Sequence, residues 1–268
     1  MSMLLTSNCG KYFTQTTLIC KRLILETFNY KHELAPMNSI ADRVHHIRAQ
    51  IQSAASASQR LAQEIILLAV SKNHDVDSIR QAYAAGCRHF GESYVQEAVT
   101  KIVQLAEPDI VWHFIGPVQS NKTQAIATHF QWVHSVERDK IAKRLNEQRP
   151  RGLPALNVCI QVNVSGEASK AGIAPDQVAQ LAAQMQQYEN LRLRGLMTIA
   201  RQAAGESDTR HTFARLRMLL HELNSAGMSL DTLSMGMSGD LCTAIQQGAT
   251  IVRVGTGIFG PRDYTKNE

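Results

Sequence analysis

Lys72 ends a short apolar stretch, residues 67–72, with the sequence LLAVSK. An apolar run that is bounded by turn residues and followed by a helical pattern is typical of a buried parallel strand. In α/β proteins, ligands bind at the carboxyl ends of such strands, because the loops that leave them build the site. A desolvated lysine at that position, close to other cations, can act as an amine nucleophile and form a Schiff base. A lysine that extends into solvent would show the same pattern, so its position alone does not assign this chemistry.

Two loops late in the chain are rich in glycine, serine and threonine, and each follows a predicted strand. They span residues 234–238 (SMGMS) and 253–257 (RVGTG). Backbone N–H groups of such loops bind anions, and barrel proteins commonly hold a phosphate after strands seven and eight. We therefore predict a phosphate site here; the alternative is that the glycines only make tight turns.

Arg253 adds a cation next to the predicted phosphate site. It could pair with the phosphate, brace the barrel through a carboxylate, or face a ring nitrogen of a cofactor. A lysine nucleophile, a phosphate site and an arginine on one barrel mouth fit pyridoxal 5'-phosphate (PLP). Arginine donates hydrogen bonds but keeps its protons, so the pyridine nitrogen would stay unprotonated and the ring would be a weaker electron sink.

The elements that must position these residues alternate along the chain. We expect eight strands, at residues 67–72, 88–92, 111–116, 132–135, 156–163, 193–199, 232–235 and 250–254, each but the last followed by a helix. One further helix, with apolar residues every three or four positions from Ile40 to Ala55, precedes the first strand. Such alternation predicts right-handed crossovers and a single (β/α)8 barrel of the TIM type with an extra N-terminal helix. The alternative is an open doubly wound sheet.

Eight motifs occur in a fixed order: LLAVSK, FGESYVQEA, WHFIGPVQSNK, VHSVE, QVNVSGEASKAGI, RGLMTIA, LSMGMSGD and VRVGTGIFGPRDY. Together they resemble the pyridoxal phosphate homeostasis protein family, single-domain PLP-binding barrels similar to the N-terminal domain of alanine racemase. The resemblance spans residues 37 to 264. It implies that Lys72 is the Schiff-base lysine, that Arg253 faces the pyridine nitrogen, and that the phosphate is held by Ser234, Ser238, Gly255 and Thr256.

The predicted cofactor-binding set is Lys72, Ser93, His113, Met197, Ser234, Met235, Ser238, Arg253, Gly255 and Thr256. Ser93 departs from the family pattern, which usually has asparagine at this position. Serine is shorter and lacks the amide, which leaves a polar contact to the cofactor ring or its hydroxyl in question.

Three functions remain open at this stage. The first is a PLP carrier or buffer that passes the cofactor to the apo-forms of PLP enzymes and has no catalytic activity of its own. The second is a PLP-dependent racemase or decarboxylase of amino acids. Racemisation needs an acid/base group on each face of the reacting carbon, and we expect this chain to lack the further domain that supplies one in two-domain racemases. The third is a sugar-phosphate barrel enzyme in which Lys72 forms an aldolase-type imine.

The amino-acid composition indicates which binding partners and which cellular compartment to expect. The 268 residues are 44% hydrophobic, and the formal net charge of +5 is spread along the chain without interleaved aromatic residues, so we expect no nucleic-acid partner. Five scattered cysteines without a C-x-x-C motif favour a reducing, cytoplasmic location. No apolar stretch is long enough to span a membrane. We also expect a monomer.

The chain divides into two parts. Residues 1–36 show no sustained periodicity and are interpreted as a disordered extension or a start-site artefact, and the PLP-binding barrel spans residues 37–268.

Overall fold

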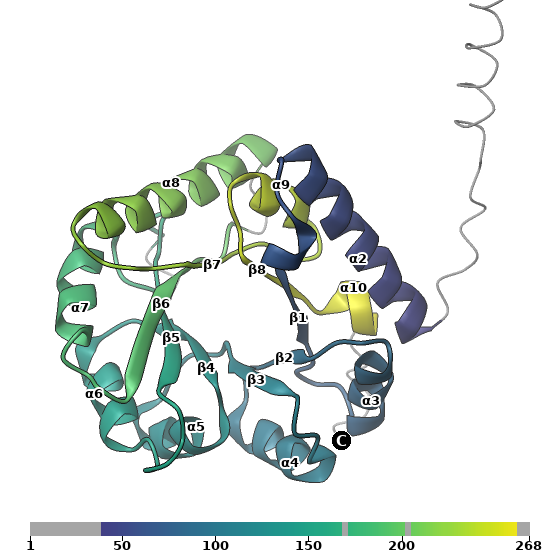
Figure 1. The fold of residues 1–268 in the computed structure, drawn as a ribbon, viewed down its shortest axis with the longest axis horizontal. Coiled ribbons are helices and arrows are strands. Elements are labelled where there is room, and N and C mark those ends of the chain that lie inside the picture. Colours follow the sequence, from purple (N-terminus) through teal and green to yellow (C-terminus); the bar gives the residue numbers. More distant parts are fainter. Residues whose placement is uncertain (1–38, 168–170, 202–204, 262–268) are drawn as a thin grey trace, which may run out of the picture. The chain divides into compact units, whose positions relative to one another are not determined.

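The structure, a computed structural model, describes residues 39–167, 171–201 and 205–261. Eight parallel strands close into a barrel in sequence order, with β8 paired to β1 (Figure 1). They are β1 (Ile66–Val70), β2 (His89–Glu92), β3 (Val111–Phe114), β4 (Trp132–Val136), β5 (Leu156–Gln161), β6 (Leu191–Met197), β7 (Thr232–Ser234) and β8 (Ile251–Val254). All eight predicted strands overlap an observed one. The predicted (β/α)8 barrel is confirmed, and the open-sheet alternative is wrong because β8 pairs with β1.

Helices surround the barrel on the outside (Figure 1). They are α2 (Ile40–Ala57), α3 (Val76–Ala84), α4 (Val95–Leu105), α5 (Thr123–His129), α6 (Asp139–Glu147), α7 (Val178–Met185), α8 (Glu206–Ser225), α9 (Leu241–Gln246) and α10 (Thr256–Phe259), with short 3₁₀ turns at Ala62–Glu64, Ser120–Lys122 and Pro175–Gln177. The expectation that no helix follows the last strand was wrong, because α10 follows β8. That helix spans only four residues and includes Gly257, so it leaves no helical periodicity in the sequence.

The extra N-terminal helix α2 begins at a capping box. The Ser39 hydroxyl accepts the N–H of Asp42, and the Asp42 carboxylate accepts the N–H of Ser39. One face of α2 is buried, with Val44, Ile47 and Ile51 in the main hydrophobic core. This face packs against α3, α9 and α10, so α2 covers the barrel where its last and first strands meet (Figure 1).

Side chains that point out of the barrel build the main core against the helices, whereas those that point inward fill the barrel itself. The inner cluster consists of Leu68, Trp132, Cys159, Met197 and Ile251. These apolar side chains, together with the buried polar side chains of His113, His134 and Ser234, fill the barrel interior below the carboxyl ends of the strands.

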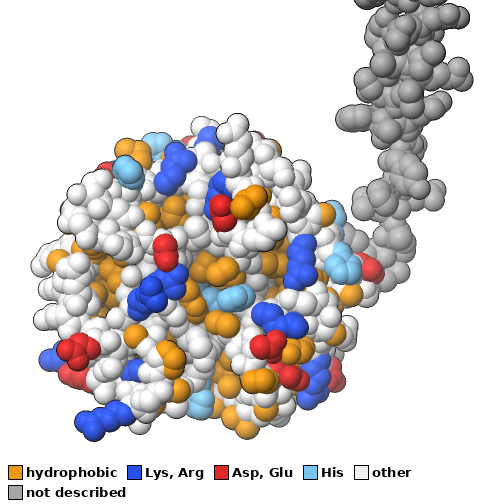
Figure 2. Space-filling view, in the orientation of Figure 1, with side chains coloured by type: hydrophobic (Ala, Val, Ile, Leu, Met, Phe, Trp, Pro, Cys, Tyr) orange, Lys and Arg blue, Asp and Glu red, His pale blue; other side chains and the backbone are white. Residues whose placement is uncertain are grey.

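Charged side chains of both signs are spread over the face shown in Figure 2 and do not gather in one basic patch. In the parts of the chain that the structure describes, no helix combines the length and the apolar character needed to cross a membrane. The predicted extension at residues 1–36 lies outside the described residues.

Candidate functional site

A cavity of about 810 Å³ lies at the carboxyl ends of the strands. Seven of the predicted cofactor-binding residues line it: Lys72, Ser93, Met197, Ser238, Arg253, Gly255 and Thr256. They come from the ends of β1, β2, β6, β7 and β8 or from the loops that follow. The expectation that strand ends converge on one mouth therefore holds for these residues.

Three predicted residues, His113, Ser234 and Met235, are not among those that line the cavity. His113 and Ser234 point into the barrel below the cavity, where both are fully buried. Met235 belongs to the main core outside the barrel, and its N–H donates to the carbonyl of Ile251 at 3.1 Å. Strand alternation explains Met235, because neighbouring residues of a strand point to opposite faces. His113 and Ser234 face inward but lie deeper in the barrel than the residues that reach the mouth.

Residues of the loops after β7 and β8 that line the cavity carry backbone donors. The N–H groups of Ser238, Gly239, Gly255 and Thr256 make no hydrogen bond to the residues that the structure describes. The two loops are joined, because the Ser238 hydroxyl accepts the N–H of Gly257 at 3.2 Å. Unpaired N–H groups gathered at one end of a cavity form a site for an oxyanion such as phosphate.

Gly236 makes the turn at the end of β7 possible. Its φ is +93°, and a Cβ at this position would lie 2.5 Å from the Cβ of Ala244. Only glycine combines this left-handed backbone with so close an approach to α9. The cavity-lining loop therefore depends on a residue that does not itself line the cavity.

Arg253 is held rigidly at the floor of the cavity, with 5% of its surface exposed. One guanidinium nitrogen, Nη1, donates to the Ser234 hydroxyl at 2.8 Å, and the other, Nη2, donates to the Thr198 carbonyl at 2.9 Å. Burial lowers the pKa of Arg253 to about 10, so the side chain remains a cation at neutral pH. Because both bonds fix a planar group, the N–H bonds that remain have a defined direction.

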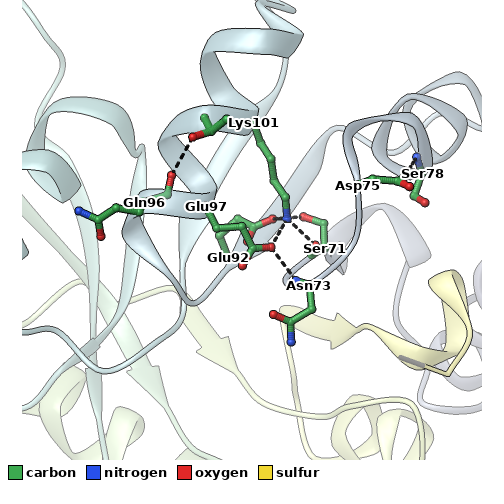
Figure 3. Close-up of polar contacts among 9 residues, drawn as sticks. Ser71, Asn73, Asp75, Ser78, Glu92, Gln96, Glu97 and Lys101 are labelled. Carbon is green, nitrogen blue, oxygen red and sulfur yellow. Dashed lines mark hydrogen bonds and ion pairs between the residues drawn. The ribbon is translucent and has the colours of Figure 1, made fainter. Parts of the chain in front are cut away.

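A buried ionic cluster lies behind the loop that carries Lys72 (Figure 3). The ammonium of Lys101 on α4 contacts Glu92 at 2.9 Å and Glu97 at 2.5 Å. The side chain of Glu92 is fully buried and that of Lys101 is 6% exposed. Burial raises the pKa of Glu92, while the Lys101 charge and the hydrogen bonds to Lys101 and Ser71 oppose this effect. The carboxylate oxygen Oε2 of Glu92 has no hydrogen-bond partner among the described residues.

This cluster fixes the residues on both sides of Lys72 (Figure 3). The Ser71 hydroxyl donates to Glu92 at 2.7 Å, and the Ser71 carbonyl accepts from Lys101 at 2.8 Å. On the other side, the N–H of Asn73 donates to Glu97 at 2.6 Å. Asn73 also has a positive φ of 62°, which turns the chain sharply after Lys72. The backbone of the loop is thereby set before any ligand arrives.

Close packing of two loops places Ser93 at the cavity. A Cβ on Gly116 would lie 2.3 Å from the Ser93 carbonyl oxygen and 2.8 Å from its Cα. The loop after β3 can therefore approach the loop after β2 only because residue 116 is glycine. The Ser135 hydroxyl also fixes the loop after β3 by donating a hydrogen bond to the Gly116 carbonyl.

Sequence reasoning missed several features of this site. Asp240, Thr243 and Thr209 line the cavity, and Asp240 accepts the N–H of Met237. Asp240 lies in the LSMGMSGD motif, which also contains the predicted cofactor-binding residues Ser234, Met235 and Ser238. Glu97 and Lys101 are four residues apart on a helix, and this spacing indicates an ion pair, which is one part of the ionic cluster.

The chain matches the family model of the alanine racemase N-terminal domain over residues 41–263. It is 57% identical over 228 residues to a pyridoxal phosphate homeostasis protein of Pseudomonas aeruginosa, covering 85% of this chain and 98% of that protein. It is 47% identical over 236 residues to the Escherichia coli protein of the same name, covering 86% and 100%. The chain belongs to the pyridoxal phosphate homeostasis protein family.

Solved structures agree with this assignment to the pyridoxal phosphate homeostasis protein family. PipY of Synechococcus elongatus, whose structure has PLP bound, matches with a TM-score of 0.74 and 38% identity, covering 83% of this chain and 100% of PipY. Alanine racemase of Corynebacterium glutamicum matches with a TM-score of 0.62, covering 85% of this chain and 63% of the racemase. At 15% identity, the racemase shares only the fold.

Proposed function

We propose that this chain binds PLP in the cavity at the barrel mouth and acts in PLP homeostasis as a reversible carrier or buffer of the cofactor. The observation that carries the proposal is the convergence of three groups on one cavity. Lys72, the buried Arg253 and four residues whose backbone N–H groups bond to none of the described residues all line it. These are the groups that the aldehyde, the phosphate and the pyridine nitrogen of PLP require.

The residues divide the binding between them. Ser238, Gly239, Gly255 and Thr256 hold the phosphate through their backbone N–H groups, and Arg253 faces the pyridine nitrogen. Lys72 would supply the amine for a linkage to the aldehyde, which would form with loss of one water and which water could reverse. This reversibility suits a carrier, which must release the cofactor intact.

The names of the relatives support the proposed role in PLP homeostasis. Relatives at 47% and 57% identity are called pyridoxal phosphate homeostasis proteins, and PipY has been solved with PLP bound. We extend the proposal to a monomer in the cytoplasm that delivers PLP to apo-enzymes. The described thiols, at Cys87, Cys159 and Cys242, are all free, as expected in a reducing compartment.

Replacement of the lysine tests the proposal directly. The protein incubated with PLP should become yellow, and borohydride followed by mass spectrometry should place the adduct on Lys72. Lys72→Ala should abolish the adduct and leave the fold intact, because the substitution shortens a loop side chain and removes no core residue. Lys122→Ala is the matched control. An adduct on Lys122 or Lys170, or an unchanged adduct in Lys72→Ala, would show that Lys72 is not the lysine that reacts with PLP.

A further inference from the structure

Three histidines form a hydrogen-bonded chain inside the barrel. The Nδ1 atom of His89 on β2 lies 2.9 Å from Nε2 of His113 on β3. The Nδ1 atom of His113 lies 2.8 Å from Nε2 of His134 on β4. The Nδ1 atom of His134 in turn lies 2.8 Å from the hydroxyl of Ser234 on β7, the same hydroxyl that accepts a hydrogen bond from Arg253. The chain thus leads through Ser234 to Arg253, which lines the cavity.

Each imidazole in this chain is neutral at neutral pH. Burial lowers the pKa of His134 to about 3, with the charge of Arg253 as the second cause. Burial also holds the pKa of His113 well below its usual range and lowers that of His89. A neutral imidazole carries one proton, so each ring has one donor and one acceptor nitrogen.

The proton on each ring can be assigned from the Arg253 end. The Arg253 guanidinium can only donate, so Ser234 accepts this hydrogen bond and needs an acceptor for its own proton. Among the described residues, the acceptor within reach is Nδ1 of His134. His134 must then carry its proton on Nε2 and donate to His113, which donates in the same way to His89. The reverse direction would leave the buried Ser234 proton without an acceptor, which costs free energy.

We propose that His134 and His113 are positioning residues that act on Arg253 through Ser234. Because the Ser234 hydroxyl donates its proton to His134, its oxygen lone pairs are available to accept a hydrogen bond from the guanidinium. Arg253 is then fixed between Ser234 and the Thr198 carbonyl, with its remaining N–H groups directed at the cavity. The inference rests on the proposed function, since it assigns His113 an indirect part in holding PLP, although His113 is not among the cavity-lining residues.

Nuclear magnetic resonance of protein labelled with ¹⁵N at histidine tests the proton assignment without the cofactor. In the wild type, His134 and His113 should show the Nε2–H tautomer and stay neutral between about pH 8 and about pH 5. Ser234→Ala removes the donor to His134, so protons should redistribute on His134 and also on His113, which does not touch Ser234. An Nδ1–H tautomer at His134 in the wild type would overturn the proposal, as would a His113 signal that Ser234→Ala leaves unchanged.

Affinity for PLP tests the positioning role. His134→Leu removes the acceptor for Ser234 and should weaken PLP binding about tenfold. His134→Gln keeps one acceptor and one donor and should recover much of the affinity, which a loss of packing alone would not explain. His221→Gln, on the exposed face of α8, is the control and should bind as the wild type does. If His134→Leu binds as tightly as the wild type, the positioning role is wrong. If the wild type itself binds no PLP, the proposed function fails instead, while the tautomer result is unaffected.

Discussion

In the proposed binding mode, Arg253 would limit the chemistry of a PLP bound in this cavity. A guanidinium opposite the pyridine nitrogen donates a hydrogen bond but does not protonate the ring, so the ring withdraws electrons weakly. Racemisation also needs an acid/base group on each face of the reacting carbon. Besides Lys72, the acid/base side chains among the described residues that line the cavity are the carboxylates of Glu206, which pairs with Arg210, and Asp240, which accepts the N–H of Met237. Both features favour storage over turnover.

We therefore predict that the PLP-loaded protein racemises amino acids poorly. Because both carboxylates are engaged by other groups, the reaction lacks one acid/base group, which typically lowers the rate about 10²- to 10⁴-fold. The measurement is the chirality of L-alanine, followed over hours, with Lys72→Ala as the background control. Inversion at about 1 s⁻¹ or faster, a rate ordinary for enzymes, would refute the prediction and favour the racemase alternative.

At the scale of elements, the position of Lys72 depends on the contact between α4 and the loop after β1. Lys101→Met should leave the carboxylates of Glu92 and Glu97 without their cation. Breaking a buried ion pair in this way destabilises proteins by about 3–5 kcal/mol, and PLP binding should weaken as the loop loosens. Denaturant unfolding and a PLP titration measure the two effects.

A matched control and a partial rescue define the test of the ionic cluster. Lys143→Met removes an exposed partner of Glu147 at 3.9 Å, and a surface pair of this kind contributes about 1 kcal/mol or less. Adding Glu92→Gln to Lys101→Met removes the uncompensated buried charge and should recover part of the stability. If Lys101→Met is no less stable than Lys143→Met, the cluster does not hold the loop.

Apolar runs made the strands predictable from the sequence, and turn residues marked the ends that carry Lys72 and Arg253. The links across the barrel were not predictable in the same way. His134 and Ser234 are 100 residues apart and meet because the barrel closes and brings β4 opposite β7. Periodicity within a strand carries no information about that register. A weaker signal was present, since each of three consecutive strands contains a histidine, at His89, His113 and His134.

At the scale of the whole molecule, we predict that residues 1–36 contribute little to the barrel. Their sequence has no hydrophobic period that could bury against another surface, so a chain that begins at Met37 should melt within a few degrees of the full chain. It should also bind PLP equally well. A large fall in melting temperature, measured by circular dichroism, would show that this segment packs on the barrel.

Acid should destabilise the whole fold through the buried histidines. In the unfolded chain an imidazole gains its proton near its ordinary pKa of 6.5, whereas His134 in the folded protein does so only near pH 3. The unfolded state therefore binds more protons over this range, and stability falls as pH drops from about 6.5. Each such imidazole contributes a slope of up to about 1.4 kcal/mol per pH unit. Glu92 acts in the opposite direction, because its raised pKa favours the folded state as pH falls.

Urea unfolding between about pH 7.5 and about pH 5 measures this slope. The double variant His113→Gln and His134→Gln should unfold with a flatter dependence on pH, because two of the groups that bind protons only in the unfolded state are gone. His221→Gln should keep the slope of the wild type, since His221 is exposed. A stability that is constant over this range, or a double variant with an unchanged slope, would mean that the imidazoles accept protons in the folded barrel. The chain of neutral donors and acceptors that ends at Arg253 would then break as pH falls through about 6.5.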